Sequence, residues 1–117
     1  MLVCDDEPDI RLLFRVAFEA AGAEVTEAVD GLDCLDSLEG TVPDLLVLDL
    51  YMPRCDGFAA LQRIHASWPD LPVVVVSAHA SVEILSTGRQ LGASACFPKP
   101  TFVSRIPALV ERYGQAA

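Results

Sequence analysis

The stretch Val73-Val74-Val75-Val76-Ser77 decides the fold, because four consecutive valines leave a strand without a polar face. A strand that is apolar on both faces is typical of a parallel sheet lying between two layers of helices. Residues 45–49 repeat the pattern, with four aliphatic residues followed by an aspartate. Each stretch is therefore predicted to be a buried parallel strand with Ser77 or Asp49 at its carboxyl end.

Apolar runs and helical spacing alternate along the whole chain. The predicted strands are residues 2–4, 24–28, 45–49, 73–77 and 93–97. Val25 is the expected core residue of the second strand. The segments between strands repeat apolar residues every three or four positions; Pro8 suits a helix start, and Gly22 and Gly40 are expected helix ends. Short links imply right-handed crossovers, so the expected fold is α/β, a five-stranded parallel sheet with helices on both faces.

Length and composition fit one folded domain over residues 1–117, with 52% hydrophobic and 21% charged residues. No apolar run approaches the ~20 residues of a bilayer span, and no segment has the pattern of a secretory signal. A cytoplasmic location without a membrane is therefore expected. The formal net charge of −9 would repel phosphate backbones, so no direct nucleic-acid binding is expected. The four cysteines lack zinc spacing, and Cys4 and Cys96 are expected to be small core residues.

Polar residues come at the ends of four predicted strands. They are Asp5 and Asp6, Asp49, Ser77 and Lys99. Because the carboxyl ends of parallel strands meet at one edge of a sheet, these groups are expected to lie close together. Three carboxylates would repel one another, and Mg²⁺ removes that repulsion while also binding phosphate oxygens. A carboxylate there can attack phosphorus and become an acyl phosphate, for which Asp49 on the central strand is the best candidate.

The sequence resembles the response-regulator receiver domain of two-component signalling, of the chemotaxis-regulator kind. The matching motifs are residues 5–8 (DDEP), 49–57 (DLYMPRCDG), 77–78 (SA) and 99–100 (KP). They occur in the family's order, each after an apolar strand, and the resemblance covers essentially the whole chain. It implies the flavodoxin-like strand order 2-1-3-4-5.

The resemblance implies a set of Mg²⁺ ligands. Asp49 is the implied phosphoacceptor and one ligand of the ion. Asp6 would bind Mg²⁺ directly and Asp5 through a water molecule. The backbone carbonyl of Tyr51 would supply a further ligand.

The resemblance also implies how a phosphoryl group is held. Lys99 would lie against a phosphoryl oxygen, aimed inward by a cis bond to Pro100; a salt bridge in the metal-free site is the alternative role. Backbone N–H groups of Tyr51 and Ala78 would complete the cradle. The Ser77 hydroxyl would donate to a phosphoryl oxygen and draw its loop inward, unless it only caps the helix that follows.

The resemblance points to three tuning residues: Cys96 for the switch, and Tyr51 and His79 for the lifetime of the phosphoryl group. Cys96 stands where the family usually has Tyr or Phe, and Phe97 should face the other side of the strand. We therefore expect a weaker or different coupling to the surface formed by the fourth helix, the fifth strand and the last helix. Tyr51 is bulky enough to screen an acyl phosphate from water, whereas His79 would orient a water or lie in solvent. Slow self-hydrolysis is predicted.

The expected function is a phospho-accepting signalling domain that turns over no metabolite. Its partners would be a sensor histidine kinase or phosphotransfer protein and an unknown output domain, with pairing of two copies through the switch surface as a further candidate. The alternative is a small Mg²⁺-dependent phosphohydrolase with an aspartyl-phosphate intermediate. Haloacid-dehalogenase-type phosphatases need a second aspartate where this chain has Tyr51, which argues against turnover. A flavin or nucleotide module would need a glycine-rich loop after the first strand, and this chain has none there.

Overall fold

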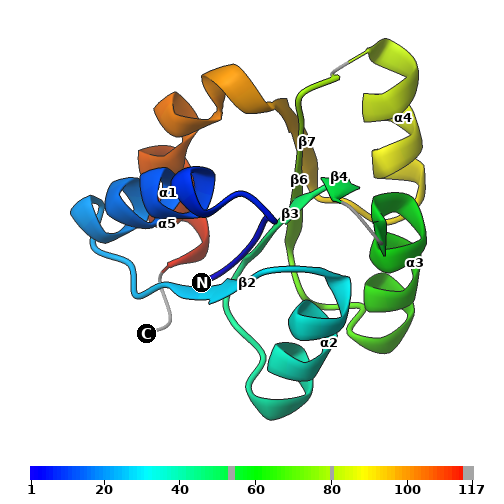
Figure 1. Cartoon of the computed structure of the whole chain (residues 1–117), viewed down its shortest axis with the longest axis horizontal. Helices are drawn as coiled ribbons and strands as arrows, with labels where there is room; N and C mark the ends of the chain where they lie inside the picture. The colour runs from blue at the N-terminus through cyan, green and yellow to red at the C-terminus, as the bar shows by residue number, and fades with distance from the viewer. Residues whose placement is uncertain (53–54, 80, 115–117) are drawn as a thin grey trace.

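The computed structural model describes residues 1–52, 55–79 and 81–114. Its main feature is a five-stranded sheet in the order β2-β1-β3-β6-β7, with every neighbouring pair parallel. The strands are β1 (Leu2–Cys4), β2 (Thr26–Ala28), β3 (Leu46–Asp49), β6 (Val73–Ser77) and β7 (Ala95–Pro98). Counted along the chain, the strands of this sheet run 2-1-3-4-5, so the predicted order is confirmed (Figure 1).

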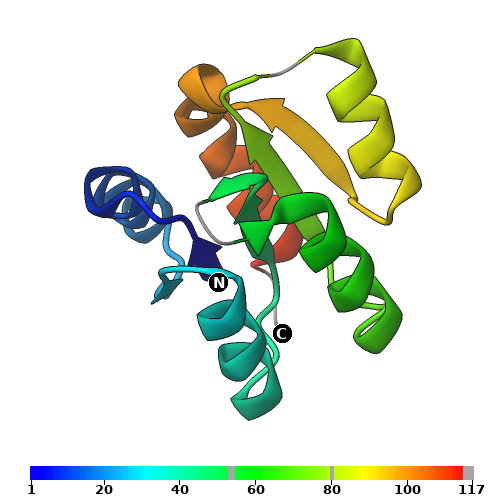
Figure 2. The ribbon, with the colours of Figure 1, turned by 45° about the vertical axis from the view of Figure 1, so that its right-hand side comes forward.

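Helices cover both faces of the sheet (Figures 1 and 2). One layer holds α1 (Pro8–Ala20), the 3-10 helix η1 (Lys99–Arg105) and α5 (Ile106–Tyr113); the other holds α2 (Gly31–Gly40), α3 (Gly57–Ser67) and α4 (Val82–Gln90). Val73 and Val75 pack in the core cluster beneath α2, α3 and α4, whereas Val74 and Val76 pack in the cluster beneath α1 and α5. All four valines are fully buried, which explains why β6 has no polar face.

Three strands begin later than predicted, β2 and β7 by two residues and β3 by one. Thr26 begins β2 by donating its N–H to the Met1 carbonyl at 2.8 Å. Val25 therefore lies outside the strand, half-buried against the α1 and α5 layer. The turn after α4 is closed by the N–H of Ala93, which donates to the Gly88 carbonyl at 3.0 Å. That bond closes the end of the helix, and β7 begins two residues after Ala93, at Ala95.

The helix ends follow the sequence in part. Pro8 begins α1, and Gly22, at φ 98°, makes the turn after that helix has ended at Ala20. Gly40 is the last residue of α2 instead of the residue that stops it. The expectation of a cis bond before Pro100 is wrong, because no described peptide bond is cis and Pro100 instead fits the first turn of η1.

None of the helices in the described residues is long and apolar enough to cross a membrane.

A short hairpin that the sequence did not reveal follows β3. Its strands are β4 (Tyr51–Met52) and β5 (Cys55–Asp56), with Tyr51 opposite Asp56. Asp56 then caps α3, accepting the N–H of Phe58 at 3.0 Å. A Cβ atom on Gly57 would overlap the backbone of Leu50, so only glycine lets the hairpin close against the end of β3.

Candidate functional site

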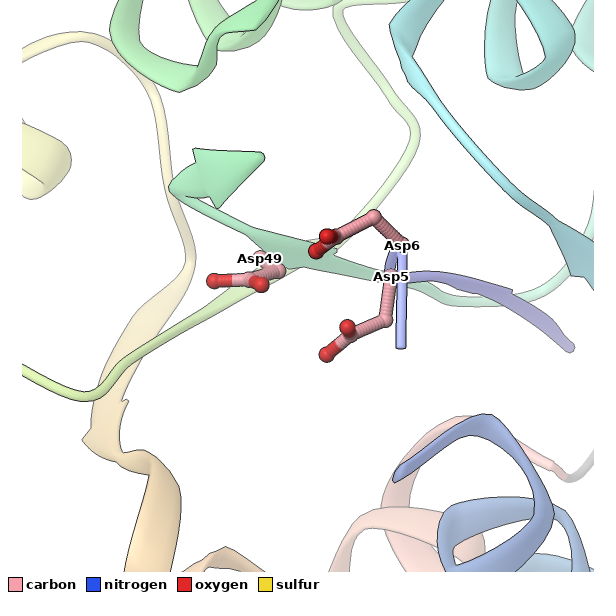
Figure 3. A group of neighbouring side chains, drawn as sticks. All are labelled: Asp5, Asp6 and Asp49. Atoms are coloured by element: carbon pink, nitrogen blue, oxygen red, sulfur yellow. The ribbon is translucent and has the colours of Figure 1, made fainter. Parts of the chain in front are cut away.

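Three carboxylates meet at the carboxyl edge of the sheet. Strands β1 and β3 pair with Cys4 opposite Leu48, so Asp5 and Asp49 come next on neighbouring strands. Asp6 follows on the same loop, and one oxygen from each of the three carboxylates lies within 4.8 Å of the others. Figure 3 shows Asp5 and Asp6 extending their carboxylates to the side on which Asp49 lies. Asp5 and Asp49 are each 1% exposed, whereas Asp6 is half-buried.

Lys99 joins this cluster from the far end of the chain. Its Nζ lies 2.9 Å from Asp5 Oδ2 and donates to Asp49 Oδ2 at 3.1 Å. It also contacts Glu7 Oε1 at 3.3 Å. The role of Glu7 was missed from the sequence, although it directly follows the acidic pair. One cation thus contacts three carboxylates and has a fourth, Asp6, in the same cluster, which leaves an excess of negative charge.

Burial and charge act on the two central groups in opposite ways. Burial raises the pKa of the Asp49 carboxyl, and neighbouring Asp5 raises it further. The N–H of Tyr51, which donates to Asp49 Oδ1 at 3.1 Å, and the Lys99 ammonium oppose this increase. Burial alone would lower the pKa of Lys99, but the carboxylates of Asp5 and Asp49 outweigh burial and raise it. Lys99 therefore stays charged at neutral pH.

The donor set fits a hard divalent cation. Asp5 Oδ2 is buried, and its partner is the Lys99 ammonium at 2.9 Å, which also pairs with Asp49 and Glu7. A single ammonium cannot neutralise all of these carboxylates, and buried charge without a counter-charge is costly unless a further cation satisfies it. Asp6 and Asp49 offer further oxygens within the same small space. The cluster therefore has the hard oxygen ligands that Mg²⁺ prefers.

Ser77 ends β6 beside the cluster and is fully buried. Asp49 is opposite Val76 in the sheet, so Ser77 lies one residue beyond the acidic side chain. Its Oγ accepts the N–H of His79 at 3.1 Å, which leaves the hydroxyl proton available to another acceptor. Helix α4 is capped by Ser81 instead, through a 3.2 Å bond from the N–H of Ile84. The alternative in which Ser77 caps this helix is therefore wrong.

The other predicted residues lie in two places: Tyr51, Ala78 and His79 near this edge, and Cys96 in the core. Ala78 is exposed beside Ser77. The ring of Tyr51, which is 48% exposed, meets the His79 ring edge to face at 5.3 Å between centroids.

Cys96 is buried in the α2, α3 and α4 cluster, and burial raises the pKa of its thiol. Phe97 packs with Phe102 in the opposite cluster, which confirms that the two neighbours face different sides.

Comparison with known proteins decides the family. The family model described as "Response regulator receiver domain" matches residues 1–111. The chain belongs to this family. As a receiver domain it is a phospho-accepting signalling domain of two-component regulators, and its role is regulatory; the phosphohydrolase alternative is not favoured.

Several relatives of this receiver domain differ in length. It is 36% identical to the DNA-binding transcriptional regulator NtrC of Escherichia coli, covering 94% of this chain but 24% of NtrC. It is 36% identical to PrrA of Mycobacterium leprae, covering 52% of that protein. Sporulation initiation phosphotransferase F of Bacillus subtilis is 30% identical, with 97% of this chain and 91% of that protein aligned. The chain thus spans about a quarter of the length of NtrC and about half of the length of PrrA.

A solved receiver domain has the same fold as this one. The receiver domain of NtrX from Brucella abortus superposes with a TM-score of 0.88 at 33% identity, covering 99% of this chain and 98% of that one. The structural match extends over the whole sheet and its helices. It therefore includes the edge at which the acidic cluster lies.

Proposed function

We propose that Asp49 accepts a phosphoryl group from a phosphohistidine donor at this edge of the sheet. The observation that carries the proposal is the contact of Lys99 with the Asp49 carboxylate inside a cluster of three aspartates. In the transfer, the P–N bond to the donor imidazole breaks as a P–O bond to Asp49 forms. The domain would promote its own phosphorylation and the hydrolysis of its own acyl phosphate, and it would turn over no metabolite.

The residues proposed to hold Mg²⁺ are Asp5, Asp6 and Asp49, with the Tyr51 carbonyl as a further ligand. The ion, when bound, would neutralise the carboxylates and bind a phosphoryl oxygen. The ammonium of Lys99 would turn from its carboxylate partners toward the incoming phosphoryl oxygens. Most of the catalysis would then come from positioning and charge, as is usual in phosphoryl transfer.

The switch would begin at Ser77. Its hydroxyl keeps a proton while accepting the N–H of His79, so it would donate that proton to a phosphoryl oxygen and draw the β6–α4 loop inward. The N–H groups of Tyr51 and Ala78 would complete the cradle. Because Cys96 is small and buried, we propose that the signal reaches the α4–β7–α5 surface through α4 itself. We also propose that two copies of the domain pair through that surface.

The proposed partner is a sensor histidine kinase or a phosphotransfer protein, with an output domain of unknown kind. We propose that the partner docks on α1, because this helix carries an exposed apolar patch. Its residues Leu12, Leu13 and Val16 are all about half exposed or more. Helix α1 begins directly after the acidic loop, so a partner on this patch would stand beside Asp49. We propose a cytoplasmic setting, a receiver domain spanning residues 1–117, and no direct contact of this domain with nucleic acid.

The test is incubation with acetyl phosphate and Mg²⁺, followed by intact mass measurement. We expect a gain of one phosphoryl group in the wild type and none in Asp49→Asn. Asp36→Asn is the matched control, since Asp36 is an exposed carboxylate on α2 outside the cluster. A phosphoryl gain that persists in Asp49→Asn would refute the assignment. Release of phosphate far in excess of protein would favour the phosphohydrolase instead.

A further inference from the structure

Arg11 ties the acidic loop to the rest of the fold, although it is not a member of the carboxylate cluster. Its Nη1 donates to the backbone carbonyl of Asp5 at 2.8 Å. Its Nε donates to Glu27 Oε1 on β2 at 3.0 Å. The Arg11 side chain is 13% exposed, so both interactions are largely shielded from water. The guanidinium therefore joins α1, β2 and the loop that follows β1.

The carbonyl that Arg11 holds belongs to the peptide between the two acidic residues of the loop. Strand β1 ends at Cys4, so regular sheet bonding ends just before Asp5. The N–H of Asp5 still donates to the Ala28 carbonyl at 3.2 Å, and its Oδ1 accepts the N–H of Glu7 at 2.9 Å. Arg11 adds the restraint on the carbonyl side. Since the Asp6 side chain extends from this peptide, turning the peptide would move the Asp6 carboxylate.

We propose that Arg11 is a positioning residue, which holds the Asp5–Asp6 peptide so that both carboxylates face Asp49 before a cation binds. This inference rests on the proposed function, because it concerns the same metal site. The guanidinium suits the task, since its planar fork binds two acceptors in fixed directions. Groups that orient metal ligands from outside the coordination shell commonly change metal affinity by ~10- to 100-fold.

Arg15 provides a matched control on the same helix. Its Nη1 also binds Glu27, at 2.7 Å to Oε2, and its Nε pairs with Glu19 at 3.5 Å. Among the described residues it forms no hydrogen bond or ion pair with the acidic loop. Removing either arginine takes one ion pair from Glu27, but only Arg11 also holds the Asp5 carbonyl.

The experiment measures the Mg²⁺ dissociation constant by calorimetry, well below the melting temperature of every variant. We expect Arg11→Met to raise the dissociation constant by about tenfold and Arg15→Met by less than about twofold. Arg11→Lys keeps the charge without the fork and should weaken binding by at least ~3-fold; it decides the test if Arg11→Met does not fold. Wild-type affinity in the Arg11 variant that decides, or equal losses in Arg11→Met and Arg15→Met, overturns the inference.

A second readout works without metal. In the metal-free protein, Arg11→Met should shift the backbone amide resonances of Asp6 and Glu7, whereas Arg15→Met should leave them in place. Unshifted resonances in Arg11→Met would contradict the positioning role. Failure of the proposed function looks different: wild-type protein would then not bind Mg²⁺, or Asp6→Asn would bind it equally well.

Discussion

Helix α4 and strand β7 approach each other closely at Gly88 and Cys96, because a Cβ atom on Gly88 would lie 2.9 Å from the Cys96 sulfur. Cys96 is 6% exposed and belongs to the core cluster beneath α2, α3 and α4. An aromatic ring facing inward from position 96 would overlap α4 as it now lies. The small side chain of Cys96 and the missing side chain of Gly88 thus together allow α4 to pack this closely on β7.

Gly88→Ala should therefore destabilise the protein, although alanine is normally the better helix residue by ~1 kcal/mol. The added methyl group would press on a buried sulfur, and overpacking of this kind costs about 1–3 kcal/mol. Set against the helix-propensity gain, this leaves a net loss of up to about 2 kcal/mol in the free energy of unfolding, measured by urea denaturation. In a Cys96→Ala background the same substitution should lose much less, because the sulfur is gone.

Gly40→Ala is the control for this prediction. Gly40 is exposed at the end of α2, has no positive φ, and a Cβ atom there would meet nothing within 4 Å. Alanine at this position should be neutral or stabilising by about 0.5 kcal/mol. Equal effects at positions 40 and 88 would show that the Gly88–Cys96 contact does not limit the packing.

Replacing the central carboxylate should stabilise the metal-free protein at neutral pH. Burial raises the pKa of Asp49 above its ordinary value, so the folded state binds this proton more tightly than the unfolded chain does. The stability that Asp49 contributes then falls as the pH rises from the ordinary aspartate pKa through the raised one. Above that range the ionised carboxylate destabilises the folded state, and Asp49→Asn removes this cost. The asparagine side chain still offers an oxygen to Lys99. We expect a gain of roughly 1 kcal/mol at pH 7.5.

Thermal melts between pH 4 and 8, without divalent ions, would measure this gain. The difference between Asp49→Asn and wild type should shrink toward pH 4, where the wild-type carboxyl also gains its proton. Asp36→Asn, an exposed carboxylate on α2, should change little at any pH. A variant that is less stable than wild type at pH 7.5 would show that the ion pair with Lys99 outweighs burial and repulsion.

Mg²⁺ should stabilise the wild-type protein in proportion to its binding. A ligand at a hundred times its dissociation constant adds ~2.7 kcal/mol when it binds the folded state alone. Asp6→Asn should lose most of this gain, because it removes one of the three clustered carboxylates. Asp9→Asn is the matched control, since Asp9 is an exposed carboxylate in the first turn of α1 outside the cluster. Melting temperatures with Mg²⁺ and with chelator, compared across the three proteins, test the metal site directly.

The parts of the structure that could be predicted share a physical origin. The valines of β6 are buried on both faces, so their pattern reflects the parallel sheet directly. The acidic cluster could be predicted because Asp5 and Asp49 each follow such a strand, and neighbouring parallel strands end together. These arguments need only the chain order and the local pattern.

The parts that could not be predicted depend on contacts between distant segments. Glu7 meets Lys99 across 92 positions of the chain, and its place directly after the acidic pair is the one local signal of this contact. Arg11 binds a backbone carbonyl, a partner that leaves no trace in the sequence. The edge strand β2 begins two residues after the predicted start, because the apolar Val25 packs on the α1 layer before pairing begins.

The ring of Tyr51 should slow loss of the phosphoryl group from phosphorylated protein. It lies next to the acidic edge, and its edge-to-face contact with His79 at 5.3 Å joins the β4–β5 hairpin to the loop after β6. Two rings in contact across this opening would hinder the approach of a water molecule to the acyl phosphate. We expect Tyr51→Ala to speed the loss by about threefold to tenfold, which equals roughly 0.7–1.4 kcal/mol in the activation barrier.

Intact mass measured over time after removal of acetyl phosphate gives the rate. Tyr51→Phe keeps the ring and should behave as wild type, whereas His79→Ala should speed the loss by a smaller factor. If the rings act as one unit, the double variant should lose phosphate no faster than Tyr51→Ala, because the contact is already broken. Val82→Ala, on an 84% exposed side chain at the start of α4, controls for general effects near the loop. A Tyr51→Ala rate equal to that of wild type would mean that water reaches the site by a route these rings do not cover.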